Sequence, residues 1–227
     1  MIDKTKRQRN FMAVGLLLLL SIWIIHRNNR PAPYQTDNGL IFGTIYQVSY
    51  QYPTSLKGEI EEALHTIDNS LSPFNQHSII TAINRNESMQ TDSLFRAVFR
   101  RSLEISAETD GAFDITVAPL INAWGFGFKK GIFPDSAQVD SLRQLIGYTR
   151  VSLDADGCVQ KEDPRLMLNC SAVAKGYAVD VVARLLQAKG IDNLMVDIGG
   201  EVVVKGHNPQ QRPWRIGINK PVDDSLA

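Results

Sequence analysis

A lysine and two carboxylates between residues 165 and 201 are the side chains whose types and spacing best suit chemistry. Lys175 lies near the start of a predicted helix, on the same side as Val179 and Val182 when residues are placed at about 100° intervals. An ammonium group on an apolar face is costly unless it reaches water or an anion, and the N–H groups at a helix start also attract anions. Lys175 is therefore a candidate partner for a phosphate or carboxylate. A lysine stem that covers the edge of the core while its ammonium stays in water gives the same pattern.

Asp197 and Glu201 flank the glycine pair Gly199-Gly200 where the chain leaves a predicted strand. Glycines permit positive φ and let a ligand approach the backbone closely, and they suit a bulge or tight turn equally well. The spacing is not the G-x-G-x-x-G of a dinucleotide-binding turn. The segment is thus either the edge of a site or a turn between strands.

These groups must be positioned by one strand–helix–strand unit. Residues 165–168 form a short apolar run that predicts a strand, and Ser171 can cap a helix start. Gly190 stands where a helix C-terminal glycine is expected, and residues 194–198 predict the returning strand.

The rest of the chain mixes strands and helices without strict alternation, which predicts an α+β fold with a mixed sheet and packed helices. Strands are expected over residues 45–50, 202–206 and 214–218, with a hairpin over 151–160 that turns at Asp-Gly. Helices are expected over residues 55–71, 78–84, 92–107 and 134–146.

Residues 1–30 have the layout of an export signal or membrane anchor, with an apolar run at 11–25 between basic flanks. No small-x-small cleavage site follows the run, which favours an uncleaved anchor in the inner membrane over an exported chain with a cleaved signal. The positive charge before the run places the domain in the periplasm. Residues 31–39, with two prolines and several polar residues, are expected to be a spacer, and residues 40–227 one domain.

The composition bears on the size of the core, on nucleic-acid binding and on cysteine-based sites. With 227 residues and 44% hydrophobic residues the chain can bury a sizeable core. Its 24 basic residues balance 24 acidic ones, which gives no global field for nucleic acid. The cysteines Cys158 and Cys170 match no zinc or redox spacing, and two separate buried thiols are favoured over a disulfide.

The run of residues 171–180, SAVAKGYAVD, followed by DIGGE at 197–201, resembles the ApbE family of flavin transferases, the FAD:protein FMN transferases. Other landmarks of that family follow in order: Phe42-Gly43-Thr44, residues 71–74, Ile83-Asn84, residues 112–116, residues 124–127, and Trp214 before Pro221. The resemblance therefore covers the chain from about residue 42 to residue 221.

The resemblance implies that the protein cleaves FAD with Mg²⁺, transfers FMN to a threonine hydroxyl of an acceptor electron-transport protein, and releases AMP. It also implies that the Ala172 carbonyl binds the metal. The residues that it places along the flavin dinucleotide are Phe42, Phe74, Ala112, Phe113, Asp114, Asn169 and Lys175.

The chain differs from the family pattern at Phe42, where a methionine is usual, and at Asn169, where many members carry an aspartate. The family's remaining magnesium ligands are expected beyond Ala227, so we expect the domain to be C-terminally incomplete and its metal site to lack ligands. Two alternatives follow. The first is a membrane-tethered protein that binds FAD without transferring FMN, and the second is a metal-dependent pyrophosphatase that hydrolyses FAD to FMN and AMP.

Overall fold

The computed structural model describes residues 12, 14–17, 19–21, 31–126 and 133–218. Its main sheet has the strand order β1-β2-β5-β6, from β1 (Tyr34–Ile41), β2 (Thr44–Gln51), β5 (Leu194–Ile198) and β6 (Glu201–Lys205). Each neighbouring pair is antiparallel. Among the described residues, parallel pairing occurs at one isolated bridge, between Val117 and Met167. The expected α+β class with packed helices is confirmed, whereas the expected mixed sheet is wrong, because the strands of the main sheet pair antiparallel throughout.

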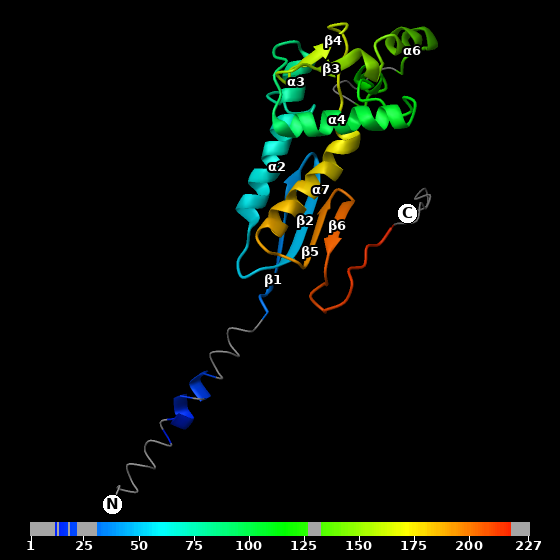
Figure 1. Ribbon diagram of the computed structural model, residues 1–227. Helices are drawn as coiled ribbons and strands as arrows, with labels where there is room; N and C mark the ends of the chain where they lie inside the picture. Colours follow the sequence, from blue (N-terminus) through cyan, green and yellow to red (C-terminus); the bar gives the residue numbers. More distant parts are fainter. Residues whose placement is uncertain (1–11, 13, 18, 22–30, 127–132, 219–227) are drawn as a thin grey trace, which may run out of the picture.

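Helices α2 (Lys57–Leu71) and α7 (Ser171–Ala188) cover one face of this sheet (Figure 1). Val48 and Val196 are fully buried on that face because alternate side chains of a strand point to the same side. They share one core with Leu64 of α2 and with Val182 of α7. Each such buried side chain contributes about 1.5 to 3 kcal/mol, so α7 is fixed against the sheet along most of its length.

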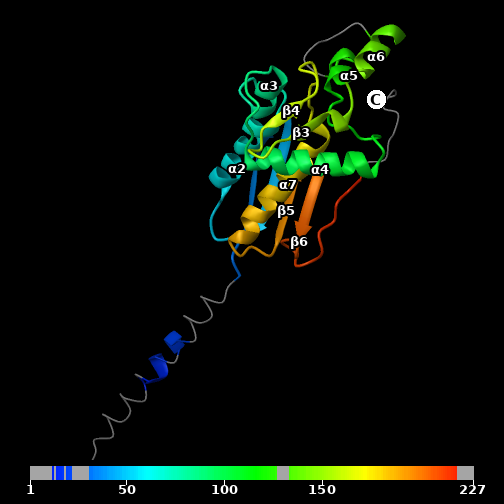
Figure 2. The same ribbon diagram turned by 45° about the horizontal axis from the view of Figure 1, so that its top comes forward.

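The second part of the molecule lies at the end of the sheet where α7 begins (Figures 1 and 2). Helix α4 (Ser93–Glu108) runs across that end. The other elements beyond it are α3 (Ile79–Asn84), α5 (Ala118–Ala123), α6 (Ser136–Arg143), the 3₁₀ turn η1 (Tyr148–Arg150) and the hairpin of β3 (Val151–Leu153) and β4 (Val159–Lys161). The first turn of α7 therefore sits between the two parts.

Local capping signals explain why most helix predictions are confirmed. The side chain of Asp92 accepts from the Phe95 amide at 2.7 Å, and Asp135 forms a capping box with Gln138. Gly190 follows the end of α7 with φ of 78°, as expected for a C-terminal glycine.

The spacer expected at residues 31–39 is wrong, because Tyr34–Ile41 is β1 and pairs along its whole length with β2. Gly39 reads as a loop residue, but a Cβ there would lie 2.7 Å from Cε1 of Tyr46. The glycine therefore makes room for a buried ring that packs across two strands. The folded domain starts at about Tyr34.

Two predicted strands are also wrong. In residues 165–168 only Met167 forms a bridge, because the backbone of Leu168 bonds to the side chain of Asn84. Residues 214–218 lie outside any strand, and Trp214 contacts the edge of β6 through its indole, which donates to the Lys205 carbonyl at 3.0 Å.

The predicted anchor at residues 1–30 lies mostly outside the described residues. Within the part of the chain that the structure describes, no helix combines the length and the apolar character needed to cross a membrane.

Candidate functional site

The two-residue turn between β1 and β2 brings an aromatic ring to the end of the sheet. Phe42 and Gly43 have φ of 52° and 72°, the left-handed pair of a type I′ hairpin turn. Glycine or asparagine suits both positions, whereas a phenylalanine held there costs about 1 to 3 kcal/mol. Strain of this kind is typical of functional positions, and here it places Phe42 on the wall of a cavity.

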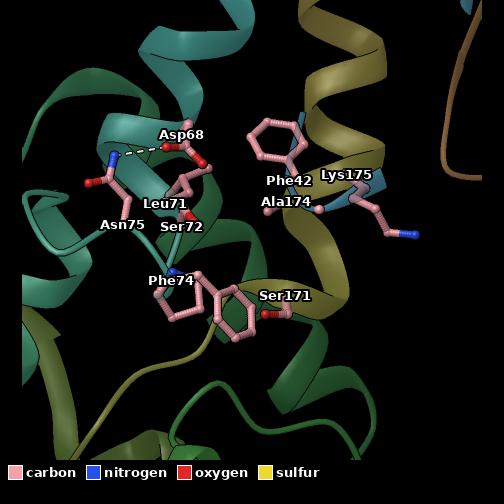
Figure 3. A pocket seen from close by; sticks show the side chains of 11 residues that line it. Phe42, Asp68, Leu71, Ser72, Phe74, Asn75, Ser171, Ala174 and Lys175 are labelled. Carbon is pink, nitrogen blue, oxygen red and sulfur yellow. Dashed lines mark hydrogen bonds between the residues drawn. The ribbon is translucent and has the colours of Figure 1, made fainter. Parts of the chain in front are cut away.

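This first cavity, of about 600 Å³, lies between the hairpin turn, the end of α2 and the start of α7 (Figure 3). Phe42 stands on one wall and Phe74, which is 60% exposed, on another. The remaining lining residues are Gly43, Asp68, Leu71, Ser72, Pro73, Asn75, Ser171, Ala174 and Lys175. A mostly apolar cavity with a few polar groups is typical of a small-molecule site.

Hydrogen bonds fix the loop that carries Phe74. Asn75 donates to the Asp68 carboxylate at 2.8 Å (Figure 3), and the Thr81 hydroxyl donates to the Asn75 carbonyl at 2.8 Å. The Ser78 hydroxyl closes the loop by donating to the Ser72 carbonyl at 2.7 Å. The aromatic wall is therefore held before any ligand arrives.

Lys175 joins the two motifs that the sequence singles out. Its stem lines the first cavity, and its ammonium extends away from Ala174 and Phe42 (Figure 3). Nζ donates to the Gly199 carbonyl at 3.3 Å and lies 3.7 Å from the Glu201 carboxylate. The stem thus covers the cavity edge, and the charged end lies at the Gly199–Glu201 turn.

A second cavity, of about 480 Å³, lies on the other side of the first turn of α7. Its walls include five of the predicted site residues: Ala112, Phe113, Asp114, Asn169 and Ala172. Ser171 lines both cavities. The predicted residues are therefore divided, with Phe42, Phe74 and Lys175 in the first cavity.

Asp114 also holds the wall of the second cavity together. One carboxylate oxygen accepts from the amide and hydroxyl of Thr116, at 2.7 and 2.6 Å. The other oxygen accepts from the Tyr148 amide at 2.8 Å, and the Thr116 hydroxyl accepts from the Gly147 amide at 2.8 Å. Asp114 thus fixes the backbone at residues 147–148 beside the cavity.

Asn169 and Asn84 fix the start of α7. The side-chain oxygen of Asn169 accepts from the Ser171 backbone amide at 2.8 Å, and the backbone amide of Asn169 donates to the Ile115 carbonyl at 2.8 Å. Asn84 holds Leu168 from the other side, accepting from its amide at 2.7 Å and donating to its carbonyl at 2.9 Å. Asparagine supplies one donor and one acceptor, which matches the backbone pair.

The ammonium group of Lys161 also supports the segment that leads into α7. Nζ of Lys161 donates to the carbonyls of Ile83, Leu166 and Pro164, at 3.0, 3.1 and 3.3 Å. Burial lowers the pKa of Lys161. The roles of Lys161 and Asn84 do not follow from local sequence pattern. Their hydrogen-bond partners are about 80 positions away in the sequence or belong to irregular backbone.

Cys170 lies directly before the shared Ser171, and it is a structural residue. It is fully buried, and burial raises the pKa of its thiol to about 12, which keeps it protonated and unreactive. Cys158 and Cys170 are both free thiols, as the sequence favours.

Of the predicted magnesium site, the described residues include Ala172. Ala172, the predicted carbonyl ligand, is exposed in the first turn of α7 and lines the second cavity. Within the described ranges no three His, Cys, Asp or Glu side chains are grouped as metal ligands. Mg²⁺ takes a nearly octahedral set of oxygens, to which waters and substrate phosphates usually contribute, so the Ala172 carbonyl would supply one position of the set.

Among the residues of the site walls that sequence reasoning missed, two carry a charge. Arg143 brings a guanidinium from α6 to the second cavity, and Asp68 brings a carboxylate from α2 to the first. Both belong to surface-like helical patterns, so no local signal separates them from solvated charges.

Comparison with known proteins gives one consistent result. The model of the ApbE family matches residues 42–227. The chain is 33% identical over 225 residues to the FAD:protein FMN transferase of Vibrio cholerae serotype O1, covering 93% of this chain and 66% of that protein. It is 31% identical over 231 residues to the enzyme of the same name from Escherichia coli K12, with the same two coverages. The chain thus spans just under two thirds of the length of these curated relatives.

Solved structures agree with the sequence comparison. The flavin transferase ApbE from Vibrio cholerae superposes with a TM-score of 0.78 at 33% identity, covering 84% of this chain and 65% of that one. The apo form of the Pseudomonas stutzeri flavinyl transferase ApbE gives a TM-score of 0.76 at 32% identity, covering 83% of this chain and 66% of that one.

Proposed function

The chain belongs to the ApbE family, and we propose from this membership that it cleaves FAD and transfers FMN to a hydroxyl of an acceptor protein. The curated relatives carry the name FAD:protein FMN transferase. The observation that carries the proposal is the pair of cavities that meet at Ser171.

The two cavities suit the two halves of FAD. The first has Phe42 and Phe74 on its walls, and an aromatic ring offers a flat partner for the isoalloxazine. The second then takes the adenosine half. The diphosphate between them would lie at the start of α7, where the positive end of the helix dipole favours anions.

The proposed transfer forms one bond and breaks another at the same phosphorus. A threonine oxygen of the acceptor attacks the FMN phosphorus, the bond from that phosphorus to the bridging oxygen breaks, AMP leaves with that oxygen, and the threonine proton is released to water. Lys175 and the start of α7 stabilise the negative charge on the diphosphate. We propose that the reaction takes Mg²⁺, which supplies charge neutralisation when bound, with Ala172 as one ligand.

The test is to incubate the chain with FAD, MgCl₂ and an electron-transport protein whose FMN is bound to a threonine. Mass spectrometry should find FMN on that protein, AMP in solution, and no attachment when the threonine is replaced by valine. Omitting MgCl₂ and adding EDTA should abolish transfer. Intact FAD with an unmodified acceptor contradicts the proposal.

Two alternatives are distinguished by the same experiment. The first alternative is a membrane-tethered protein that binds FAD without transferring FMN. It predicts FAD binding without AMP. A metal-dependent FAD pyrophosphatase predicts AMP and free FMN, with no FMN on the acceptor.

We further propose that residues 1–30 anchor the chain in the inner membrane, with the domain from about Tyr34 facing the periplasm. The basic residues before the apolar run of residues 11–25 support this orientation. Membrane fractionation with N-terminal sequencing tests it, and a mature protein that starts beyond Arg30 overturns the anchor in favour of a cleaved signal.

A further inference from the structure

The turn at Gly199–Glu201 contacts Lys175 from a fixed position. The Gly199 amide donates to the Ile45 carbonyl at 3.0 Å, and the Asp197 carboxylate accepts from the Gly200 amide at 3.0 Å. A Cβ on Gly199 would lie 2.8 Å from the Thr44 side chain, so the turn packs closely against β2. Because α7 is fixed against the sheet as well, the distance from Glu201 to the helix is set by the fold.

Lys175 has two alternative sets of oxygen partners within reach of its flexible stem. One set is the Gly199 carbonyl and the Glu201 carboxylate, where Nζ lies at 3.3 and 3.7 Å. The other is the phosphate of a ligand in the first cavity, which the same side chain lines. The side chains of Lys175 and Glu201 are 36% and 51% exposed, and an exposed ion pair of this kind is weak enough to exchange.

We propose that Glu201 is a positioning residue that acts through Lys175, by holding the ammonium at the turn in competition with the ligand phosphate. This inference rests on the proposed function, since it assumes that the first cavity takes a flavin with a phosphate. Glu201 thereby sets the affinity for phosphorylated flavins without contacting them. Removal of its charge releases the ammonium to the phosphate.

The test is fluorescence titration of FAD, FMN and riboflavin against Glu201→Gln at low ionic strength. FAD and FMN should bind roughly threefold more tightly than to the unchanged chain, a change within the range of exposed ion pairs. Riboflavin has no phosphate, and its affinity should not change. In a Lys175→Met background, the substitution at Glu201 should have no effect on any of the three.

A matched control lies at the other end of the same helix. Lys189 at the end of α7 pairs with Glu59 at 2.6 Å, away from both cavities. Glu59→Gln removes the same charge and the same type of pair, and it should leave all three affinities unchanged. Thermal unfolding of each variant confirms that the comparison is between folded proteins, and Glu201→Asp, with a shorter reach, provides a second variant that should shift affinity in the same direction.

Three outcomes overturn the inference. FAD affinity that is unchanged or weaker in both Glu201 variants shows that the carboxylate does not compete. A gain that persists in the Lys175→Met background shows direct repulsion of the phosphate. Failure of the unchanged chain to bind FAD overturns the proposed function, and the inference with it.

Discussion

Phe42 combines an unfavourable backbone conformation with a place on the cavity wall, which separates its contribution to binding from its contribution to stability. Its φ of 52° belongs to the region that asparagine and glycine occupy most easily. Its ring packs only partly against the core. A residue that the turn does not favour is therefore explained best by what its ring contacts in the cavity.

We predict that Phe42→Asn weakens FAD binding about tenfold while the melting temperature stays the same or rises. The loss of an aromatic contact lowers affinity, and the relief of about 1 to 3 kcal/mol of backbone strain offsets the lost packing. Flavin fluorescence titration and thermal unfolding measure the two effects.

Gln211 supplies the matched control, because it has φ of 58° in a turn away from both cavities. Gln211→Asn should stabilise the protein slightly and leave FAD affinity unchanged. A large fall in melting temperature for Phe42→Asn would show instead that the ring mainly supports the core.

Asn84 substitutes for a strand by bonding both backbone groups of Leu168. We predict that Asn84→Ala lowers the free energy of unfolding by about 2 to 4 kcal/mol, because it leaves a part-buried amide and carbonyl without partners. FAD affinity should fall too, since the Leu168–Ser171 segment leads into both cavities. Urea denaturation and flavin titration provide the measurements.

Asn208 is the control for that experiment. Its side-chain oxygen also accepts from two backbone amides, those of Gln210 and Arg212 at 3.0 Å each, but at an exposed turn. Asn208→Ala should cost no more than about 1 kcal/mol, because water replaces the lost partner. Equal losses in the two variants would contradict a special role for Asn84.

At the scale of elements, a buried polar cluster joins β1, β2 and the start of α2. The Tyr50 hydroxyl donates to the Asp37 carboxylate and accepts from the Leu56 amide at 2.5 Å. Ser55 donates to the other oxygen of Asp37 at 2.8 Å. Burial, followed by the hydrogen bond to Asp37, raises the pKa of Tyr50 to about 12.

This cluster predicts loss of stability in alkali. The pKa of Tyr50 is higher in the folded state than the value of about 10 in the unfolded chain. Its contribution is therefore complete below pH 10 and is lost as the pH rises through 12, by at most about 2 to 3 kcal/mol. Urea denaturation between pH 8 and pH 12 should show this fall.

Tyr50→Phe should make that pH dependence shallower, although the protein is less stable at pH 8 because Leu56 loses its acceptor. Some dependence should remain, since burial and Glu61 also raise the pKa of Tyr46. An unchanged slope in Tyr50→Phe would exclude Tyr50 as the group responsible.

Helices α2, α3, α4, α6 and α7 and strand β5 could be predicted because their signals are local, whereas the short helix α5 was not predicted. Asp92 caps α4, Gly190 ends α7, and the alternation in residues 194–198 defines β5. The wrong predictions concern segments whose contacts are with residues distant in the sequence. Gly39 belongs to a strand because Tyr46 packs over it, and residues 165–168 are held by Asn84 instead of a strand.

The candidate site was predictable only as a set of residues. The family resemblance selects Phe42, Phe74, Asn169 and Lys175, and the structure places each on a cavity wall. The division into two cavities depends on where the first turn of α7 lies between the two parts of the molecule. That position is a property of tertiary packing, so no single stretch of sequence carries it.

At the scale of the whole molecule, the sheet with α2 and α7 supplies one cavity, and the elements beyond α4 supply most of the other. A ligand that occupies both must pass the exposed side chain of Ser171. The fragments of such a ligand should therefore respond separately to changes on each side.

We predict that Phe74→Ala weakens riboflavin and FAD about five- to tenfold and leaves AMP unchanged, because the proposed arrangement puts the flavin ring against Phe74 in the first cavity. Ala112→Trp fills part of the second cavity, so it should weaken AMP and FAD and leave riboflavin unchanged. Both positions are exposed, which lets either variant fold. Isothermal titration with the three ligands separates the cavities, and FAD should be the only ligand that both substitutions weaken.

If Phe74→Ala weakened AMP and Ala112→Trp weakened riboflavin, the two halves of FAD would lie in the opposite cavities. If neither substitution weakened FAD, its binding site would lie elsewhere on the molecule.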